Sequence, residues 1–234
     1  MLLWIIASIL AFFVKGLCGF ANTLVFSTIL SFQNNNINIS PVDLLIGYPP
    51  NIIMAYKERK NIDLKICLPL IALIIIGNIP GILFLKNADT QLIKILFGFV
   101  IIGIGIEMLV QDKKKESKTM LTLIGILSGF LCGLYGIGAL LAAYVNQVTD
   151  DTQSFKGNIC LVFTFENTFR IIVYSLLGIV TFNTIKQAIL LLPLMLIGLS
   201  LGIKCSQYVN ETTTKKLVIV MLIISGIALI INNI

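Results

Sequence analysis

Histidine is absent from this 234-residue sequence, and charged side chains make up only 12% of it. Because no histidine is available and the five cysteines form no CxxC pair, a Cys/His zinc site is excluded. The GxxxxGKS/T nucleotide loop is missing, which argues against ATP-driven pumping by this chain. No nucleophile–base constellation is evident either. We therefore expect no enzyme activity, no metal and no cofactor.

Apolar residues are what the sequence has in abundance, at 57% against about 45–50% in ordinary soluble domains. They come in runs of the length that a helix needs to cross about 30 Å of hydrocarbon. Residues 68–85 and 217–231 contain no charged side chain, whereas a soluble helix would show a polar face. We predict an all-α integral membrane protein whose main partner is the lipid bilayer.

Eight apolar stretches stand out, and two of them are unusual. The first and the fifth are too long for one span and too short for two, and each has a glycine cluster in its middle. Such a cluster predicts a broken or re-entrant helix. The stretches lie at residues 2–32, 41–56, 66–86, 91–110, 120–146, 157–178, 186–204 and 215–232.

The net charge of +6 comes largely from two basic loops between apolar stretches, at residues 57–65 and 111–119. Basic loops mark the cytoplasmic side of a membrane protein, and no aromatic residues interleave with these lysines as nucleic-acid binding would need. We predict that both loops are cytoplasmic and that nucleic acid is not a partner. If the first and fifth stretches each cross once, both termini are cytoplasmic as well.

The chain also repeats itself. Residues 13–24 and 130–141 carry similar glycine-rich motifs, and a GxxxG pair recurs in each half of the chain. We predict two homologous four-segment halves, 1–110 and 120–234, joined by the cytoplasmic basic linker 111–119. Four crossings in each half make parallel repeats; two crossings for each broken stretch make five per half and inverted repeats. We favour four plus four, and the oligomeric state stays open, a homo-oligomer included.

Three segments together resemble a known family. They are KGLCGF at residues 15–20, SGFLCGLYGIG at 128–138 and NID at 61–63. The pattern is similar to the sulfite exporter TauE/SafE family, also described as sulfonate uptake permeases, over nearly the whole chain. The sequence departs from that family at Ala21-Asn22 and Ala139-Leu140, where members often have glycine. The resemblance implies transport of a small sulfur-containing or organic anion across the plasma membrane.

The glycine breaks themselves predict an anion site. A helix that restarts after a break presents free N–H groups and a partial charge of about +0.5 at its N-terminus. Two such ends in mid-membrane could face one small oxyanion. The alternative is that the motif glycines are packing notches, which is the interpretation we favour for Gly77, Gly81, Gly198 and Gly202. The candidate substrate-binding glycines are Gly16, Gly19, Gly133, Gly136 and Gly138.

Charged side chains inside apolar stretches are a sharper signal, since each costs about 2.5–3.5 kcal/mol at a helix centre on insertion scales. Lys15 lies beside the first break, and Glu166 and Arg170 lie in the sixth stretch. We predict that Lys15 and Arg170 hold the anion with Asn22 and Asn167, and that Glu166 couples transport to protons. The alternatives are a self-satisfied Glu166–Arg170 pair, a lysine that snorkels to the surface, and an asparagine that bonds a neighbouring helix.

The sequence therefore favours a secondary transporter or permease for a small anion such as sulfite or a sulfonate, with a mid-membrane site built by the two broken stretches. Two other classes stay open. A passive anion channel would share the positive pore, although a TVGYG-type filter is missing. A non-transporting scaffold subunit would tolerate the loss of Lys15 and Arg170.

Overall fold

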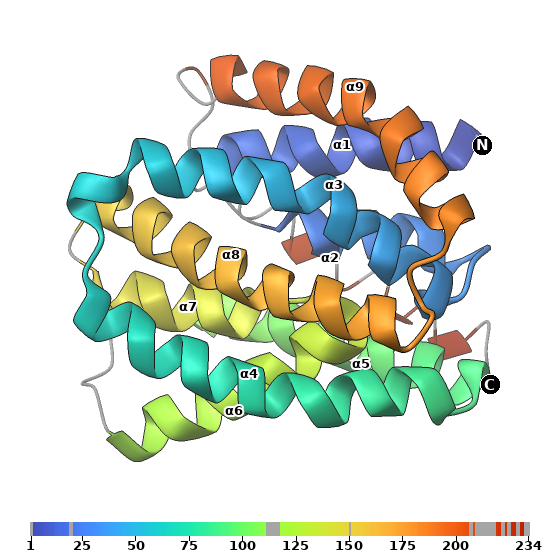
Figure 1. Cartoon of the computed structure of the whole chain (residues 1–234), viewed down its shortest axis with the longest axis horizontal. Helices are drawn as coiled ribbons and strands as arrows, with labels where there is room; N and C mark the ends of the chain where they lie inside the picture. Colours follow the sequence, from blue (N-terminus) through green and yellow to red (C-terminus); the bar gives the residue numbers. More distant parts are fainter. Residues whose placement is uncertain are drawn as a thin grey trace.

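The computed structural model describes residues 2–18, 21–110, 118–149 and 151–205, and beyond these residues 208, 219–220, 223, 226–227 and 230–231. Every regular element within them is a helix, which confirms the all-α fold class. The helices are α1 (Leu2–Cys18), α2 (Asn22–Ser31), α3 (Asn36–Lys57), the short 3-10 helix η1 (Arg59–Asn61), α4 (Leu64–Asn87), α5 (Thr90–Val110), α6 (Lys118–Tyr135), α7 (Ala139–Val148), α8 (Thr152–Leu176) and α9 (Phe182–Cys205). Figure 1 shows the long helices lying broadly along one common direction.

Both glycine-rich stretches are interrupted in the structure. The first forms α1 and α2, with Ala21 in the left-handed region at φ 71° directly before α2. The second forms α6 and α7, and Gly136 adopts φ 77° between them. Trp4, near the start of α1, packs edge-on against Phe26 of α2 with ring centroids 5.8 Å apart. The chain therefore turns back after α1, and α2 is a short re-entrant helix.

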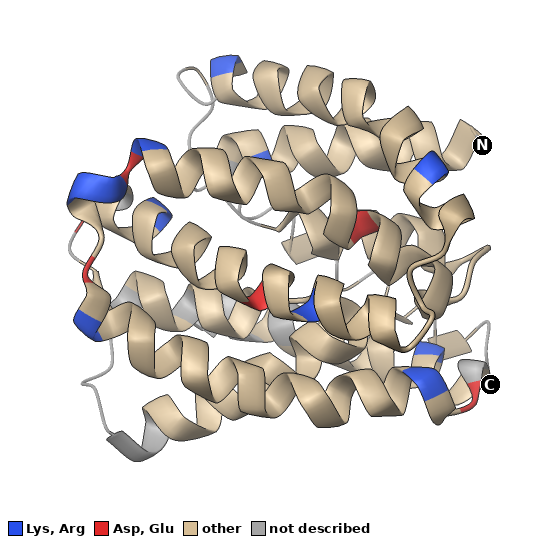
Figure 2. Ribbon diagram, in the orientation of Figure 1, with Lys and Arg blue, Asp and Glu red and all other residues tan. Residues whose placement is uncertain are grey.

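Membrane-spanning character is visible in length, composition and surface. Large apolar side chains such as Leu68, Ile76 and Ile189 are exposed on the outer faces of the helices, where lipid can cover them. Figure 2 shows most charged residues near the helix ends and only a few in the middle of the molecule. The helices that are long and apolar enough to cross a bilayer are Leu64–Asn87, Gln153–Leu176 and Phe182–Cys205, with shorter apolar helices beside them. The predicted count of eight crossings stays a prediction, since the last stretch lies largely outside the described residues.

Close glycine contacts join two helix pairs. Helix α1 packs along α9, and α4 packs along α6. A Cβ added to Gly198 or Gly202 of α9 would run into the backbone carbonyls of Ile9 and Phe13 in α1. Gly77 and Gly81 of α4 face the carbonyls of α6 in the same way. This confirms the packing role predicted for these four glycines, because only glycine lets two helix backbones approach so closely.

Candidate functional site

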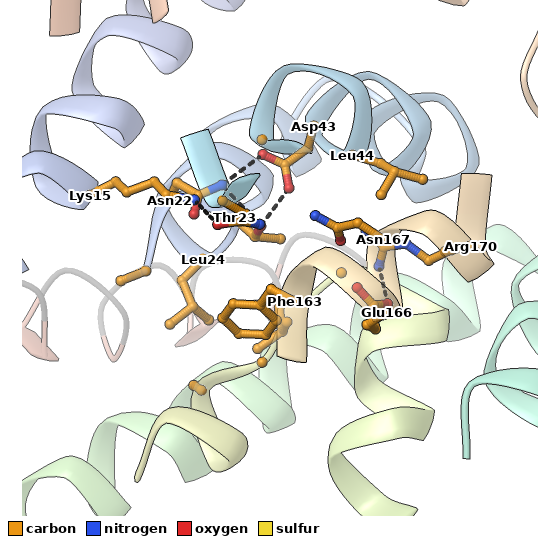
Figure 3. A pocket seen from close by; sticks show the side chains of 17 residues that line it. Lys15, Asn22, Thr23, Leu24, Asp43, Leu44, Phe163, Glu166, Asn167 and Arg170 are labelled. Atoms are coloured by element: carbon orange, nitrogen blue, oxygen red, sulfur yellow. Dashed lines mark hydrogen bonds and ion pairs between the residues drawn. The ribbon is translucent and has the colours of Figure 1, made fainter. Parts of the chain in front are cut away.

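A small buried cavity lies where the two helix breaks meet. Its walls come from α1, from the starts of α2 and α7, and from the middles of α3 and α8. Figure 3 shows the polar side chains of these elements pointing toward one another around the cavity. The lining includes Lys15, Asn22, Thr23, Asp43, Asn51, Gly136, Gly138, Phe163, Glu166, Asn167 and Arg170.

The two helices that restart after the breaks, α2 and α7, point their N-termini at this cavity without a capping side chain. Ala21 is the N-cap of α2 and Gly138 is the N-cap of α7, and neither makes a side-chain cap bond. By contrast, the N-caps of α4 and α8, Asp63 and Asp151, accept backbone N–H groups of their first turns. The Asp151 carboxylate lies at an exposed helix start, and the hydrogen bonds from Ser154 and Gln153 lower its pKa. The cavity thus gathers two uncapped, partially positive helix ends.

Two cations project into the same space, and both are buried, at 3% exposure for Lys15 and 2% for Arg170. Lys15 Nζ donates to Asn51 Oδ1 of α3 at 2.8 Å, so the lysine is held inside the bundle and does not snorkel outward. Arg170 donates from Nη1 to the carbonyl of Cys132 at the end of α6. Its Nε has no hydrogen-bond partner among the described residues. A buried guanidinium N–H without a partner is costly, so the site can gain by receiving an acceptor.

Glu166 has one ion-pair partner and one hydrogen-bond donor. Arg170 Nη1 lies 3.6 Å from Glu166 Oε1, which confirms the pairing that their four-residue spacing suggests. Asn78 Nδ2 of α4 donates to the same oxygen at 2.9 Å. Because Glu166 is only 2% exposed, this pair is a buried ion pair that also lines the cavity.

Asp43 is a second buried carboxylate, which the sequence did not single out. It is 2% exposed and lies on α3 across the cavity from Arg170. Thr23 Oγ1 donates to Asp43 Oδ2 at 2.5 Å, and Asn22 Nδ2 lies 3.4 Å from Asp43 Oδ1. Both donors belong to the first turn of α2, so this carboxylate sits at one of the uncapped helix ends.

Glycine is required at the second break for two reasons. Gly136 has φ 77°, which side-chain-bearing residues rarely adopt. A Cβ at Gly136 would also lie 3.0 Å from Thr23 Cγ2 and 3.1 Å from Arg170 Nη1. At Gly138 a Cβ would collide with the ring of Phe163. The backbone of this turn therefore approaches the cavity side chains directly.

Most of the predicted site residues lie together around this cavity. Gly16 and Gly133 do not line it: Gly16 faces the backbone of α9, where an added Cβ would lie 2.6 Å from Leu199 O, and Gly133 faces Asn78 of α4. Gly19 lies outside the described residues. The residues brought together are Lys15, Asn22, Gly136, Gly138, Glu166, Asn167 and Arg170.

Several lining residues escaped the sequence interpretation. Thr23 and Phe163 carry no signal that separates them from other helix residues. Asp43 does carry one, because an ionisable residue within a membrane helix is a functional candidate by default. The stretch predicted at 41–56 placed Asp43 at a membrane edge, whereas α3 begins at Asn36 and carries Asp43 into the bundle.

Comparison with known proteins places this arrangement in a family. A family model described as "Sulfite exporter TauE/SafE" matches residues 4–229 of the chain. No curated protein matched the chain. No solved structure matched it either.

Proposed function

Because this chain belongs to the sulfite exporter TauE/SafE family, whose members are membrane transporters, we propose that it is a secondary transporter that carries a small sulfur oxyanion through the cavity. Sulfite and short sulfonates are the substrate classes that the family name and the cavity chemistry favour. One observation supports this most strongly: two uncapped helix N-termini and two buried cations converge on a single cavity.

The cavity contains positive charge and hydrogen-bond donors, which are the groups that bind an anion. Each helix end supplies a partial charge of about +0.5 and free N–H donors. Lys15 adds a buried ammonium, and Arg170 adds a planar guanidinium whose fork geometry suits an oxyanion. Arg170, which lines the cavity, also has a donor to spare, because its Nε has no hydrogen-bond partner among the described residues. Small apolar molecules would gain none of these contacts.

We further propose that the two halves are inverted repeats of five segments each, in place of four plus four. The packing supports this, since the first α-helix of each half pairs with the fourth α-helix of the other half: α1 with α9, and α6 with α4. The re-entrant form of α2 supports it as well, because α1 and α2 then end on the side where α1 began. In such a transporter the halves rock around the shared site to expose it alternately.

This arrangement changes the expected orientation. In Figure 1, α3 ends at the side of the bundle opposite the N-terminus. By the directions of their helices, Lys57, Arg59, Lys60, Lys65, Lys156 and Lys204 lie at that side, while Lys86, Lys94 and Lys186 lie at the N-terminal side. If the basic side is cytoplasmic, the N-terminus faces outward. The cytoplasmic termini expected from the sequence depended on single crossings by the first and fifth stretches. We propose the plasma membrane as the location of this membrane protein.

Transport assays in proteoliposomes test the proposal. We expect saturable uptake of radiolabelled sulfite, thiosulfate or a short sulfonate, with counterflow of labelled for unlabelled anion. Lys15→Met should abolish uptake of the preferred anion while the protein still folds. The matched control is Lys86→Met, which removes an exposed lysine far from the cavity and should leave uptake unchanged.

The outcomes separate the competing functions. Counterflow distinguishes a carrier from a passive channel, because a channel shows conductance without saturation or exchange. If folded wild-type protein moves none of these anions, the sulfur-anion proposal is wrong. If uptake persists in Lys15→Met, the anion does not pass through this cavity.

A further inference from the structure

We propose that Asp43 is the proton-carrying carboxylate of this transporter, so that one proton binds at Asp43 when the anion binds in the cavity. This inference rests on the proposed transport function and assigns its coupling to a residue that differs from the sequence-derived candidate, Glu166. The proton comes from the aqueous side where the anion enters. It leaves to the other side when the anion does.

The two buried carboxylates, Asp43 and Glu166, differ in their partners. Glu166 is bound by Arg170, a permanent cation, and by Asn78, whose amide N–H can only donate. A proton on Glu166 would therefore leave the guanidinium without its counter-charge. Asp43 is bound by neutral groups, and the shorter contact is to a hydroxyl. A hydroxyl can exchange roles, so the Thr23–Asp43 hydrogen bond survives protonation with Asp43 as its donor.

The charge balance of the cavity also favours a proton on Asp43. The charged groups that face Asp43 are Lys15 from α1 and Arg170 and Glu166 from α8, while α2 contributes the neutral Asn22 and Thr23. Tyr174 of α8 lies one turn away and is bonded to Ser40, and Cys132 of α6 lies beside Arg170. Two cations and two carboxylates cancel when the cavity is empty. A monovalent anion would leave one uncompensated buried charge, and protonation of Asp43 removes it.

Asp43 also lies beside the start of α2. Its carboxylate occupies the uncapped end of this helix through Asn22 and Thr23, where an ionised Asp43 takes the place that a substrate anion would take. Figure 3 shows the Asp43 side chain directed at these two residues, with hydrogen bonds to both. Once Asp43 is neutral, the positive end of α2 is left without a negative partner and can attract the anion. Proton binding and anion binding thereby favour each other.

The test uses proteoliposomes with labelled sulfite and two assays, uptake driven by a pH gradient and counterflow without a gradient. Asp43→Asn keeps the shape and the contacts of a protonated carboxyl group. We expect it to lose the gradient-driven component of uptake while counterflow persists and no longer depends on pH. The sulfite uptake that Glu166→Gln retains should still respond to the pH gradient. Asp89→Asn, the same change at an exposed position, should behave as wild type.

Each outcome decides the matter. Gradient-driven accumulation that persists in Asp43→Asn overturns the proposal, and so does a folded Asp43→Asn variant that has lost counterflow, since Asp43 then serves anion binding itself. If wild type moves no anion at all, the transport function fails first and this inference falls with it. Should Asp43→Asn not fold, Thr23→Val provides the second test. It removes the reversible hydrogen bond and should move the pH midpoint of uptake, whereas Thr23→Ser should not; an unmoved midpoint in Thr23→Val overturns the proposal.

Discussion

Asn78 Nδ2 on α4 lies 2.9 Å from Glu166 Oε1 on α8, and this hydrogen bond ties the tightly packed α4–α6 pair to the cavity. Asn78 is fully buried, and its backbone carbonyl and side-chain oxygen both face Gly133 of α6. The Asn78 side chain therefore bonds α8 through its Nδ2, while its Oδ1 packs against α6 and has no hydrogen-bond partner among the described residues. A buried hydrogen bond between membrane helices stabilises their packing because no water is present to replace it.

Replacement of Asn78 by Ala should weaken the fold through Glu166. The carboxylate would lose its hydrogen bond from Asn78 and keep only the ion pair with Arg170, and a lost buried hydrogen bond to a charged group costs about 1–3 kcal/mol. Thermal or denaturant unfolding in detergent measures the change. Asn87→Ala at the exposed end of the same helix is the control and should stay within about 0.5 kcal/mol of wild type. Equal losses in the two variants would contradict a role for the Asn78–Glu166 bond.

A double-mutant cycle can separate the contribution of the Glu166–Arg170 pair to stability from its contribution to transport. Arg170→Met alone leaves an uncompensated buried carboxylate and should cost about 3–5 kcal/mol of unfolding free energy. Adding Glu166→Gln removes that charge, so the double variant should recover much of the stability. We expect anion flux to stay absent in the double variant, because the guanidinium is gone. Flux that returns along with stability would show that the pair serves the fold alone.

The charged residues of the site were predicted from the sequence more accurately than the glycines that line it. Lys15, Glu166 and Arg170 stood out because charge is rare in apolar stretches, and they line one cavity. Among the motif glycines, Gly136 lines the cavity while Gly16 faces α9, and nothing local separates the two. Whether a glycine lines the cavity or faces a neighbouring helix depends on which helix packs against it. That is a long-range contact, which cannot be read from a single sequence. The direction of α2 after its break was undetermined for the same reason.

Gly136 and Gly178 form a matched pair for the helix break. Both have positive φ, at 77° and 72°, so alanine at either position should cost about 1–2 kcal/mol of backbone strain. Only Gly136 adjoins the cavity, since a Cβ at Gly178 meets nothing within 4 Å. We expect Gly178→Ala to lose stability and keep transport, and Gly136→Ala to lose both. Unfolding in detergent and counterflow in proteoliposomes measure the two quantities, and normal counterflow in Gly136→Ala would place this turn outside the transport path.

The close contact between α1 and α9 depends on the absence of a side chain at Gly202. A methyl group at Gly202 would overlap the Phe13 carbonyl and lie 2.9 Å from Gly16 Cα, so Gly202→Ala must push the two helices apart. Overpacking of this kind costs about 1–3 kcal/mol. Gly103→Ala on α5 is the control, because its Cβ meets nothing within 4 Å and alanine favours a helix over glycine by about 1 kcal/mol.

The two glycine variants should therefore shift the unfolding midpoint in opposite directions. Since α1 carries Lys15 and Gly16 lies one residue farther along the same helix, displacement of α1 also moves the ammonium relative to Asn51. We expect Gly202→Ala to weaken anion binding as well as the fold. If Gly202→Ala is destabilised but binds the anion normally, the α1–α9 contact stabilises the fold without positioning Lys15.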